Sequence, residues 1–430
     1  MAKSVSKPMN PVLQRSEQEV PSKRWTVMVF MGAGPIDGDA PLKQYAEADV
    51  AEMKEVRSDG PGGTLNIFVQ IHGLGPATRE WAGFEDPEPV PDDNASVQDG
   101  TALLRFIEWS MEKSQNSLDD YCLLVLWGHA YRFAIGRQET PSGVDAVDFG
   151  ELGAALVEFQ DRMRKIYGHP NPRLDVVGFD ACDIATLEMA NELAPFADYM
   201  IGSQIGIPLP GWPYKTLLER LKTPRGPYPM TPADFGSFAV REFCANYSEP
   251  GFDGKPLPVS LTLLDLSQAA AAFDAAELLA RALAQAGADD LEQLELIQEQ
   301  FLAAQTLDGK PFIDVADFCL NLSRWSGSSE VRETAARLGD ILIRPRKDGA
   351  AQKPDARRRE PADRRPRGSF IVDHARNSHE TAKLQGVSLY APHILGDGFD
   401  WRTSRFWYNK FDFTGETYWG RLVHVLAEGD

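Results

Sequence analysis

Two residues with the chemistry of a nucleophile and a base each follow an apolar run. Cys182 comes shortly after the run 174–179, and His129 comes shortly after the run 121–127; both runs are typical of buried strands. A cysteine thiolate attacks carbonyl carbons, and an imidazole transfers protons near neutral pH. The carboxyl ends of parallel strands meet at one edge of a sheet, where ligands bind. We therefore expect the two side chains to lie together as a nucleophile–base pair.

The pattern after Cys182 predicts a helix that starts at once and runs to residue 193, with Ile184, Leu187 and Glu188 facing inward. A thiol beside the positive end of a helix is favoured as thiolate. A structural alternative stays open for each residue, because buried cysteines and single histidines after a strand often serve packing alone.

The apolar runs 25–31, 65–71, 121–127, 174–179 and 199–203 alternate with predicted helices at 42–56, 97–111, 149–167 and 187–193. Alternation of this kind predicts an α/β fold, a doubly wound and mostly parallel sheet flanked by helices. The stretch 130–148, with its glycines and proline, is expected to be a loop.

The second half has a different pattern. It predicts a strand at 259–265, a strand at 386–392 that we assign to the same sheet, and helices at 231–247, 268–286, 291–305, 312–325, 331–343 and 401–426. The expected organisation is a tail (1–23), an α/β core (24–225), a helical subdomain with one core strand (226–343), a disordered basic loop (344–368) and a segment that completes the core (369–430).

Composition limits the classes of function. The chain of 430 residues has a formal net charge of −19, which argues against nucleic acid as a general partner. Its four cysteines are scattered, without zinc spacing, so no metal site is expected and a reducing compartment is favoured. The polar N-terminus lacks a signal-peptide pattern, and no apolar run of about 18 residues predicts a membrane span. We expect a soluble, cytoplasmic protein.

Two motifs near the first strand suggest functions that the sequence supports only weakly. Gly32 and Gly34 could belong to a dinucleotide loop, but the third glycine is missing and Pro35 follows at once. Asp37 and Asp39 could meet a hard cation, but no EF-hand spacing follows. A solvated loop is the preferred interpretation.

Several stretches together resemble the clostripain-type (C11 family) cysteine peptidases, which have the caspase-like fold. The similar stretches are WTVMVFM (25–31), LLVLWGH (123–129), DVVGFDACDIATLEMANEL (175–193), ADYMIGSQ (197–204), GWPY (211–214), FIDVADFC (312–319), GVSLYAP (386–392) and YNKFDFTGETYWGRL (408–422). The resemblance covers most of the chain.

The resemblance implies hydrolysis of peptide bonds in protein or peptide substrates. Cys182 would be the nucleophile, His129 the proton donor, and the backbone N–H groups of Ala130 and Cys182 the oxyanion site. Family members prefer Arg or Lys before the cleaved bond, and Asp180 would be the acid that binds it. The alternative for Asp180 is a helix cap. The mechanism requires no cofactor, although some relatives bind calcium.

The chain departs from the family pattern in two places. Tyr131, Arg132 and Phe133 follow Ala130 where the family usually has glycine and small residues. Ile205 stands where an acidic residue often follows Ser-Gln. The first departure supports an alternative function, a catalytically inactive caspase-like scaffold or regulatory binding protein, and the second argues against a preference for Arg or Lys.

The resemblance also implies a zymogen matured by internal cleavage after a basic residue, by the chain itself or by an activating protease. The stretch 344–367 has ten Lys and Arg against four Asp and Glu, a net charge of +6. Candidate cleavage sites are Arg137, Arg357, Arg358, Arg359, Arg364, Arg365 and Arg367. The basic stretch could equally be a solvated linker or an electrostatic tether. A regulatory role in a bacterial cell would fit the missing secretion signal.

Overall fold

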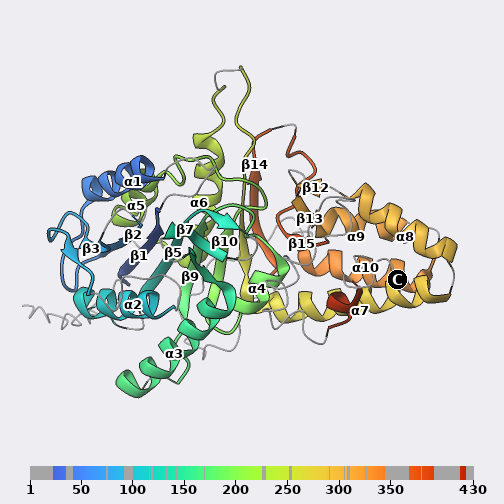
Figure 1. Cartoon of the computed structure of the whole chain (residues 1–430), viewed down its shortest axis with the longest axis horizontal. Helices are drawn as coiled ribbons and strands as arrows, with labels where there is room; N and C mark the ends of the chain where they lie inside the picture. Colours follow the sequence, from blue (N-terminus) through green and yellow to red (C-terminus); the bar gives the residue numbers. More distant parts are fainter. Residues whose placement is uncertain are drawn as a thin grey trace, which may run out of the picture.

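A nine-stranded sheet forms the centre of the computed structural model (Figure 1). The structure describes residues 23–34, 42–73, 76–91, 100–115, 117, 120–131, 134–140, 143–168, 170–224, 229–250, 254–289, 291–304, 306–307, 310–324, 327–343, 368–378, 380–391 and 417–422. Within these ranges, the strands of this sheet are β1 (Trp25–Gly32), β2 (Leu65–His72), β3 (Thr78–Trp81), β4 (Glu88–Pro89), β5 (Tyr121–Gly128), β9 (Leu174–Asp180), β10 (Ala197–Gly202), β11 (Ser260–Asp265) and β14 (Ile371–Arg376).

The strand order is β14-β11-β10-β9-β5-β1-β2-β3-β4. The central strands, from β10 to β2, pair in parallel, and the outer pairs are antiparallel. The predicted α/β class with a mostly parallel sheet is confirmed. From β1 the chain passes to β2 on one side, and it later returns as β5 on the other side. The carboxyl ends of β1 and β5 therefore flank a topological switch point, where α/β sheets bind ligands.

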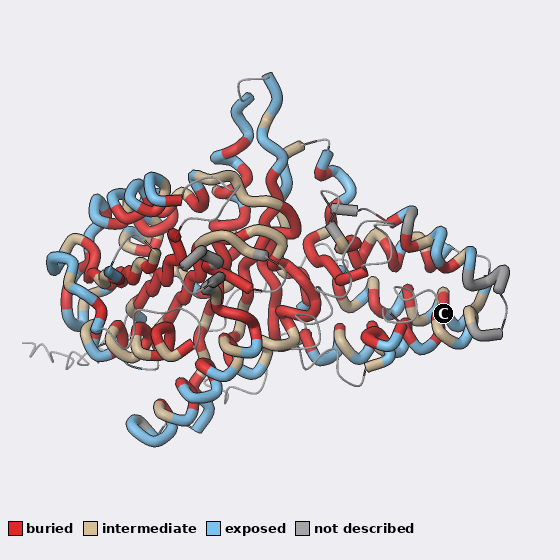
Figure 2. Tube along the Cα trace, viewed as in Figure 1, coloured by how far each residue is buried: buried red, intermediate tan, exposed pale blue. Residues whose placement is uncertain are grey.

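Helices cover both faces of the sheet (Figure 1). On one face are α1 (Lys43–Val56), α5 (Tyr214–Lys222) and α6 (Pro232–Asn246). On the other are α2 (Thr101–Ser114), α3 (Phe149–Tyr167) and α4 (Leu187–Leu193). Each layer encloses its own apolar core, and the strands between them are buried along their length (Figure 2). The sheet is thus rigid where its strand ends carry the site.

A helical subdomain extends the second face. It contains α7 (Ala269–Asp289), α8 (Leu291–Ala303), α9 (Val315–Arg324) and α10 (Ser329–Leu342), with a small sheet in the order β12-β13-β15. The small sheet contains β12 (Thr306–Leu307), β13 (Lys310–Asp314) and β15 (Ser388–Tyr390).

Two predictions in this region were wrong. The helix expected at 312–325 begins only at Val315, because 310–314 form strand β13. A short apolar run does not by itself distinguish a strand from a helix. The strand expected at 386–392 is β15 of the small sheet, and β14 occupies the edge of the main sheet instead.

The stretch expected to be a loop at 130–148 forms a three-stranded antiparallel sheet of β6 (Ala130–Tyr131), β7 (Ala134–Thr140) and β8 (Gly143–Asp148). Its glycines mark turns and close contacts rather than an open loop. A Cβ on Gly32 would lie 2.4 Å from Cα of Gly136, so β7 packs its backbone directly on the end of β1. Gly32 therefore serves backbone packing. Gly34 lies just beyond β1, and Asp37 and Asp39 lie outside the described residues.

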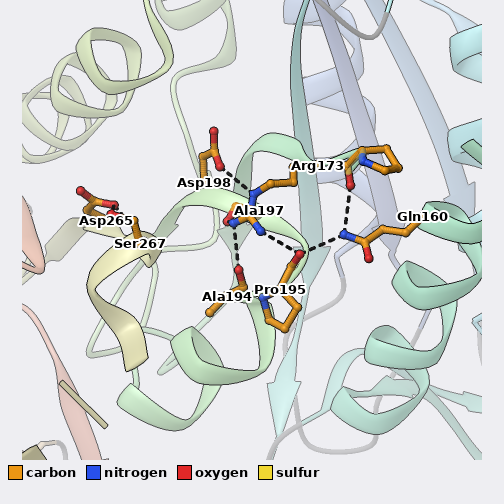
Figure 3. A network of polar contacts seen from close by, with 9 residues as sticks. Gln160, Arg173, Ala194, Pro195, Ala197, Asp198, Asp265 and Ser267 are labelled. Atoms are coloured by element: carbon orange, nitrogen blue, oxygen red, sulfur yellow. Dashed lines mark hydrogen bonds and ion pairs between the residues drawn. The ribbon is translucent and has the colours of Figure 1, made fainter. Parts of the chain in front are cut away.

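The start of β9 is fixed at the opposite edge of the sheet by a polar network (Figure 3). Arg173 donates to Asp198 Oδ1 at 2.8 Å and to the carbonyl oxygens of Ala194, Pro195 and Ala197. From α3, Gln160 donates to Pro195 O at 2.9 Å. These bonds join α3, β9 and the turn before β10, so the strand that leads to Cys182 is anchored at its base.

The expected division into tail, core, subdomain and basic loop is not tested by the described ranges, since 1–22 and 344–367 lie outside them. Of the predicted helix at 401–426, only 417–422 are described, and 418–422 are helical. None of the helices in the described ranges is long and apolar enough to cross a lipid bilayer.

Candidate active site

His129 and Cys182 meet at the carboxyl edge of the sheet. β5 and β9 are neighbouring parallel strands, and their last registered pair is Trp127 with Asp180. His129 comes two residues after Trp127, and Cys182 comes two residues after Asp180, so each lies just past the end of its strand. Both line one small cavity of about 40 Å³, together with Gly128 and other residues from the loops that follow the strands. The topology thus brings together the two residues that the sequence singled out.

Cys182 lies in a turn, and the helix predicted to start directly after it begins later, at Leu187. The Thr186 side chain caps α4 by accepting from Met189 N at 3.1 Å. The expectation that Cys182 feels the helix N-terminus is therefore wrong, because the dipole effect falls off within one turn. The alternative that Asp180 caps this helix is wrong for the same reason.

The turn that carries Cys182 is held by the loop after β10. Asp183 N donates to Ile205 O at 3.2 Å, and Ala185 N donates to Ser203 O at 2.9 Å. Asp183 has φ of 62°, in the left-handed region that few residues other than glycine adopt. Such backbone strain persists where surrounding contacts over-determine the conformation. The turn therefore presents the thiol in a fixed direction.

Cys182 is the half-buried member of the four cysteines; the other three are buried. Burial raises the pKa of the Cys122 and Cys319 thiols far above the usual value and that of Cys244 to about 12. The Cys182 sulfur accepts a hydrogen bond from Ile207 N at 3.3 Å. An N–H donor at the sulfur stabilises negative charge there. Cys182 is thus the thiol best placed for nucleophilic attack.

Asp180 lies in the wall of the same cavity with 5% of its surface exposed. Its Oδ2 accepts hydrogen bonds from Trp212 N at 2.9 Å and from the Tyr214 hydroxyl at 3.1 Å. Its Oδ1 is buried and has no hydrogen-bond partner among the described residues. Burial raises the pKa of Asp180 to about 7, because the two donors only partly replace the water lost to the carboxylate.

The loop after β10 forms one wall of the cavity, with Ile207, Pro208, Leu209 and Gly211. Gly211 has φ of 64°, and a Cβ there would lie 2.6 Å from Asp180 Oδ2. Glycine is therefore required where the loop approaches the carboxylate. The loop is thus fastened to Asp180.

The other predicted site residues have different surroundings. Ala130 is the first residue of β6 and pairs with Ile135; it is not among the described residues that line the cavity. Ile205 is buried in the core on the opposite face of the sheet from Trp212 and Tyr214. An acid at position 205 would not share the Asp180 pocket.

The candidate cleavage sites are only partly described. The prediction that places Arg137 in a flexible loop is wrong, because the residue belongs to strand β7. The remaining candidates lie outside the described residues: Arg357, Arg358, Arg359, Arg364, Arg365 and Arg367. Cleavage at any of them stays a prediction.

The sequence analysis missed Asp49 of α1. Its carboxyl Oδ2 accepts a hydrogen bond from Trp127 Nε1 at 2.8 Å, and the residue is 3% exposed. Burial, followed by repulsion from Asp180, raises the pKa of Asp49 to about 9. The signal was available, since Asp49 lies on the inward stripe of the helix, three residues after Ala46 and four before Met53.

Among the described residues, no group of three or more His, Cys, Asp and Glu side chains could hold a metal ion. Calcium binding therefore stays an inference from the family resemblance.

A sequence profile of the Clostripain family matches residues 35–350. The chain belongs to the clostripain family of cysteine peptidases. No curated protein matches the chain as a whole or in part. Membership of this family establishes the chemical class of the protein as a peptidase and hydrolase, and it makes protein or peptide the substrate class.

Solved structures of the C11 family have the same fold. An inactive zymogen C11 protease from Parabacteroides distasonis matches with a TM-score of 0.56 and 15% identity, covering 93% of this chain and 99% of that one. A secreted C11 cysteine protease from Bacteroides thetaiotaomicron, in complex with an irreversible peptide inhibitor, matches with a TM-score of 0.54 and 17% identity, covering 91% and 99%. At these identities the likeness shows the caspase-like fold, which confirms the predicted fold class.

Proposed function

We propose that this clostripain-family peptidase is an endopeptidase that cleaves after Arg or Lys with a Cys182–His129 dyad. The observation that carries the proposal is the shared cavity at the ends of β5 and β9, which holds a half-buried thiol, an imidazole and a buried carboxyl. Thiol and imidazole supply nucleophile and proton carrier, and the carboxyl supplies selectivity for a cation.

The proposed reaction has two steps. The Cys182 thiol gives its proton to His129, the sulfur attacks the scissile carbonyl carbon, the C–N bond breaks, and the amine leaves with that proton. Water then gives a proton to His129 and attacks the thioester, which releases the carboxylic acid and restores the thiol. The backbone N–H groups of Cys182 and Ala130 are the candidate donors to the oxyanion.

Asp180 is the proposed partner for the substrate cation. Its Oδ1 is buried without a partner among the described residues, and a guanidinium or ammonium group would supply the missing donors. The cost of burying this carboxylate is then offset only when a basic side chain binds. A preference for Arg or Lys follows, because a neutral side chain would leave the buried carboxylate without a charged partner.

The small volume of the cavity supports a zymogen. About 40 Å³ accommodates a water molecule and excludes a lysine or arginine side chain. Activation therefore requires the 207–211 loop to move, which internal cleavage after a basic residue would permit. At Arg137 the β7–β8 hairpin would have to open first, because a strand that is hydrogen-bonded to its neighbour cannot enter a protease cleft. The protein itself or an activating protease would make the cut.

The experiment compares wild type, Cys182→Ala and Cys244→Ala with fluorogenic peptides that end in Arg, Lys or Leu, before and after limited treatment with trypsin, which is inhibited before the peptide is added. Cys244 is a matched control, since its thiol is buried and has a raised pKa. We expect turnover of the Arg and Lys peptides by wild type and Cys244→Ala, and none by Cys182→Ala.

A denaturing gel of the same proteins separates the two routes of maturation. Fragments that are missing from Cys182→Ala indicate self-cleavage, and fragments that persist indicate another protease. Absence of turnover by treated wild type would overturn the proposal and favour a catalytically inactive scaffold.

A further inference from the structure

We propose that Asp49 is a second acidic residue of the specificity site, and that Asp49 and Asp180 act together as an acid pair whose negative charge stabilises the bound substrate cation. This inference rests on the proposed function, in which Asp180 binds Arg or Lys. It assigns to α1 a role in specificity that the family pattern places elsewhere, at the position occupied here by Ile205.

Trp127 connects the two carboxyl groups. It is the registered neighbour of Asp180 on the adjacent strand, and both residues line the cavity. The Trp127 indole donates to Asp49 Oδ2 at 2.8 Å. Asp49 is thereby held on the same face of the sheet as Trp212 and Tyr214, which donate to Asp180, although it is not among the described residues that line the cavity.

A buried carboxylate oxygen without a hydrogen-bond donor indicates that the pair binds a ligand. Asp180 is 95% buried, and its Oδ1 finds no donor in the described part of the chain, although Oδ2 has two. Buried carboxyl oxygens normally have donors, so an exception beside a thiol and an imidazole indicates a binding position.

The surroundings of the pair are acidic. The titratable groups that face it from the packed elements, or share its cavity, are Glu52 of α1, Tyr214 of α5, Tyr247 after α6, and His129. The charged neighbours that act on Asp49 are both acids, Asp180 and Glu52. A second negative charge is therefore disfavoured until a cation enters.

The consequence is a two-step dependence of substrate binding on pH. Burial and mutual repulsion raise the pKa values of the pair to about 7 and about 9, so one carboxyl of the pair ionises before the other. A bound cation favours both ionised forms, so binding releases protons and tightens as pH rises through each step. The net effect is selectivity for a basic side chain that continues to increase above pH 7.

The test measures kcat/KM for a matched peptide pair that ends in arginine or in citrulline, its uncharged isostere, from pH 6 to pH 9.5. The ratio of the two values cancels the ionisations of Cys182 and His129. In Asp49→Asn the Asn oxygen still accepts from Trp127, so the packing is preserved. We expect this variant to follow wild type near pH 6.5 and to lose about tenfold in the ratio at pH 9, which corresponds to about one pKa unit.

Glu55→Gln is the control, because it removes one charge from the exposed side of the same helix. It should leave the ratio unchanged at every pH. If Asp49→Asn does not fold, Trp127→Phe provides a second variant. Without the indole donor, the second rise of the arginine-to-citrulline ratio should move to higher pH.

The outcomes separate the two proposals. A profile of Asp49→Asn that coincides with wild type, while Asp180→Asn loses the arginine preference, would overturn the acid pair and leave the proposed function intact. An arginine preference that survives Asp180→Asn would overturn both.

Discussion

Asp180 and Asp314 are two buried carboxyl groups with raised pKa values and different bonding. Asp314 Oδ1 accepts from Asp317 N at 2.8 Å, and its Oδ2 accepts from Gln204 Nε2 at 2.9 Å and Gln385 N at 2.7 Å. Both of its oxygens are therefore satisfied. At Asp180 the two donors reach one oxygen, and the other has no partner among the described residues.

The Asp314 site is a structural junction. It begins α9 and joins the small sheet of the subdomain to Gln204, just after β10. Gln204 also accepts from Gly386 N, and Ser388 N donates to Ala185 O in the turn that carries Cys182. The subdomain thereby supports the turn that carries Cys182.

The comparison teaches that burial alone does not identify a functional carboxyl. Burial raises the pKa of Asp314 to about 6 and that of Asp180 to about 7. The difference is that one oxygen of Asp180 has no hydrogen-bond donor among the described residues, and that Asp180 lies in a cavity wall. A fully bonded carboxyl fixes a fold, whereas a partly bonded one can take a ligand.

The largest effect is expected from Asp180→Asn. The amide oxygen can still accept from Trp212 and Tyr214, but the charge is lost. We expect kcat/KM for an Arg peptide to fall about a thousandfold or more, because a buried charged pair loses one partner. The citrulline peptide should change little. An equal loss on both peptides, measured side by side, would show that Asp180 acts on the fold and not on selectivity.

The next effect is on stability. Ile205→Asp restores the acid common in the family, but position 205 faces the core opposite the Asp180 pocket. We expect the free energy of unfolding to fall by about 3 kcal/mol or more, since an unpaired carboxyl would be buried. Urea unfolding measures this. A gain in Arg over citrulline selectivity, with unchanged stability, would show that residue 205 does reach the pocket.

The smallest effect concerns pH. The folded pKa of Asp314, about 6, exceeds the usual value of 3.8, so the folded state binds the proton more tightly than the unfolded state. Its contribution to stability is greatest below about pH 4 and is lost as pH rises to about 6. We expect Asp314→Asn to flatten the dependence of the unfolding free energy on pH over that range by up to about 3 kcal/mol.

Glu333→Gln, on the exposed side of α10, is the control for this measurement and should keep the wild-type slope. Parallel slopes for wild type and Asp314→Asn would mean that the junction does not hold a perturbed carboxyl. The Arg over citrulline ratio should be the same in all three proteins.

Much of the fold followed from the sequence, because local patterns carry it. The central parallel strands are apolar runs, and α3 occupies the predicted span because Asp148 and Glu151 form a capping box at its start. Since parallel strands end at one edge, the sequence also predicted that His129 and Cys182 would meet.

The rest depended on pairings between distant segments, which no local pattern encodes. The sequence could not place β14 at the sheet edge and β15 in the small sheet, because both choices satisfy the same apolar alternation. It could not predict that α4 begins only at Leu187, because contacts with the loop after β10 hold the residues before the helix in a turn.

The sequence by itself determined the family, the strand ends and the two residues suited to catalysis, because these depend on residue type and on short-range periodicity. Only the tertiary structure decided that Asp49 bonds to Trp127, the strand neighbour of Asp180, that Ile205 lies in the core on the other face of the sheet, and that Asp314 is fully bonded. The physical reason is that the charge state and bonding of a buried carboxyl depend on donors, acids and apolar surface supplied by elements far apart in the chain.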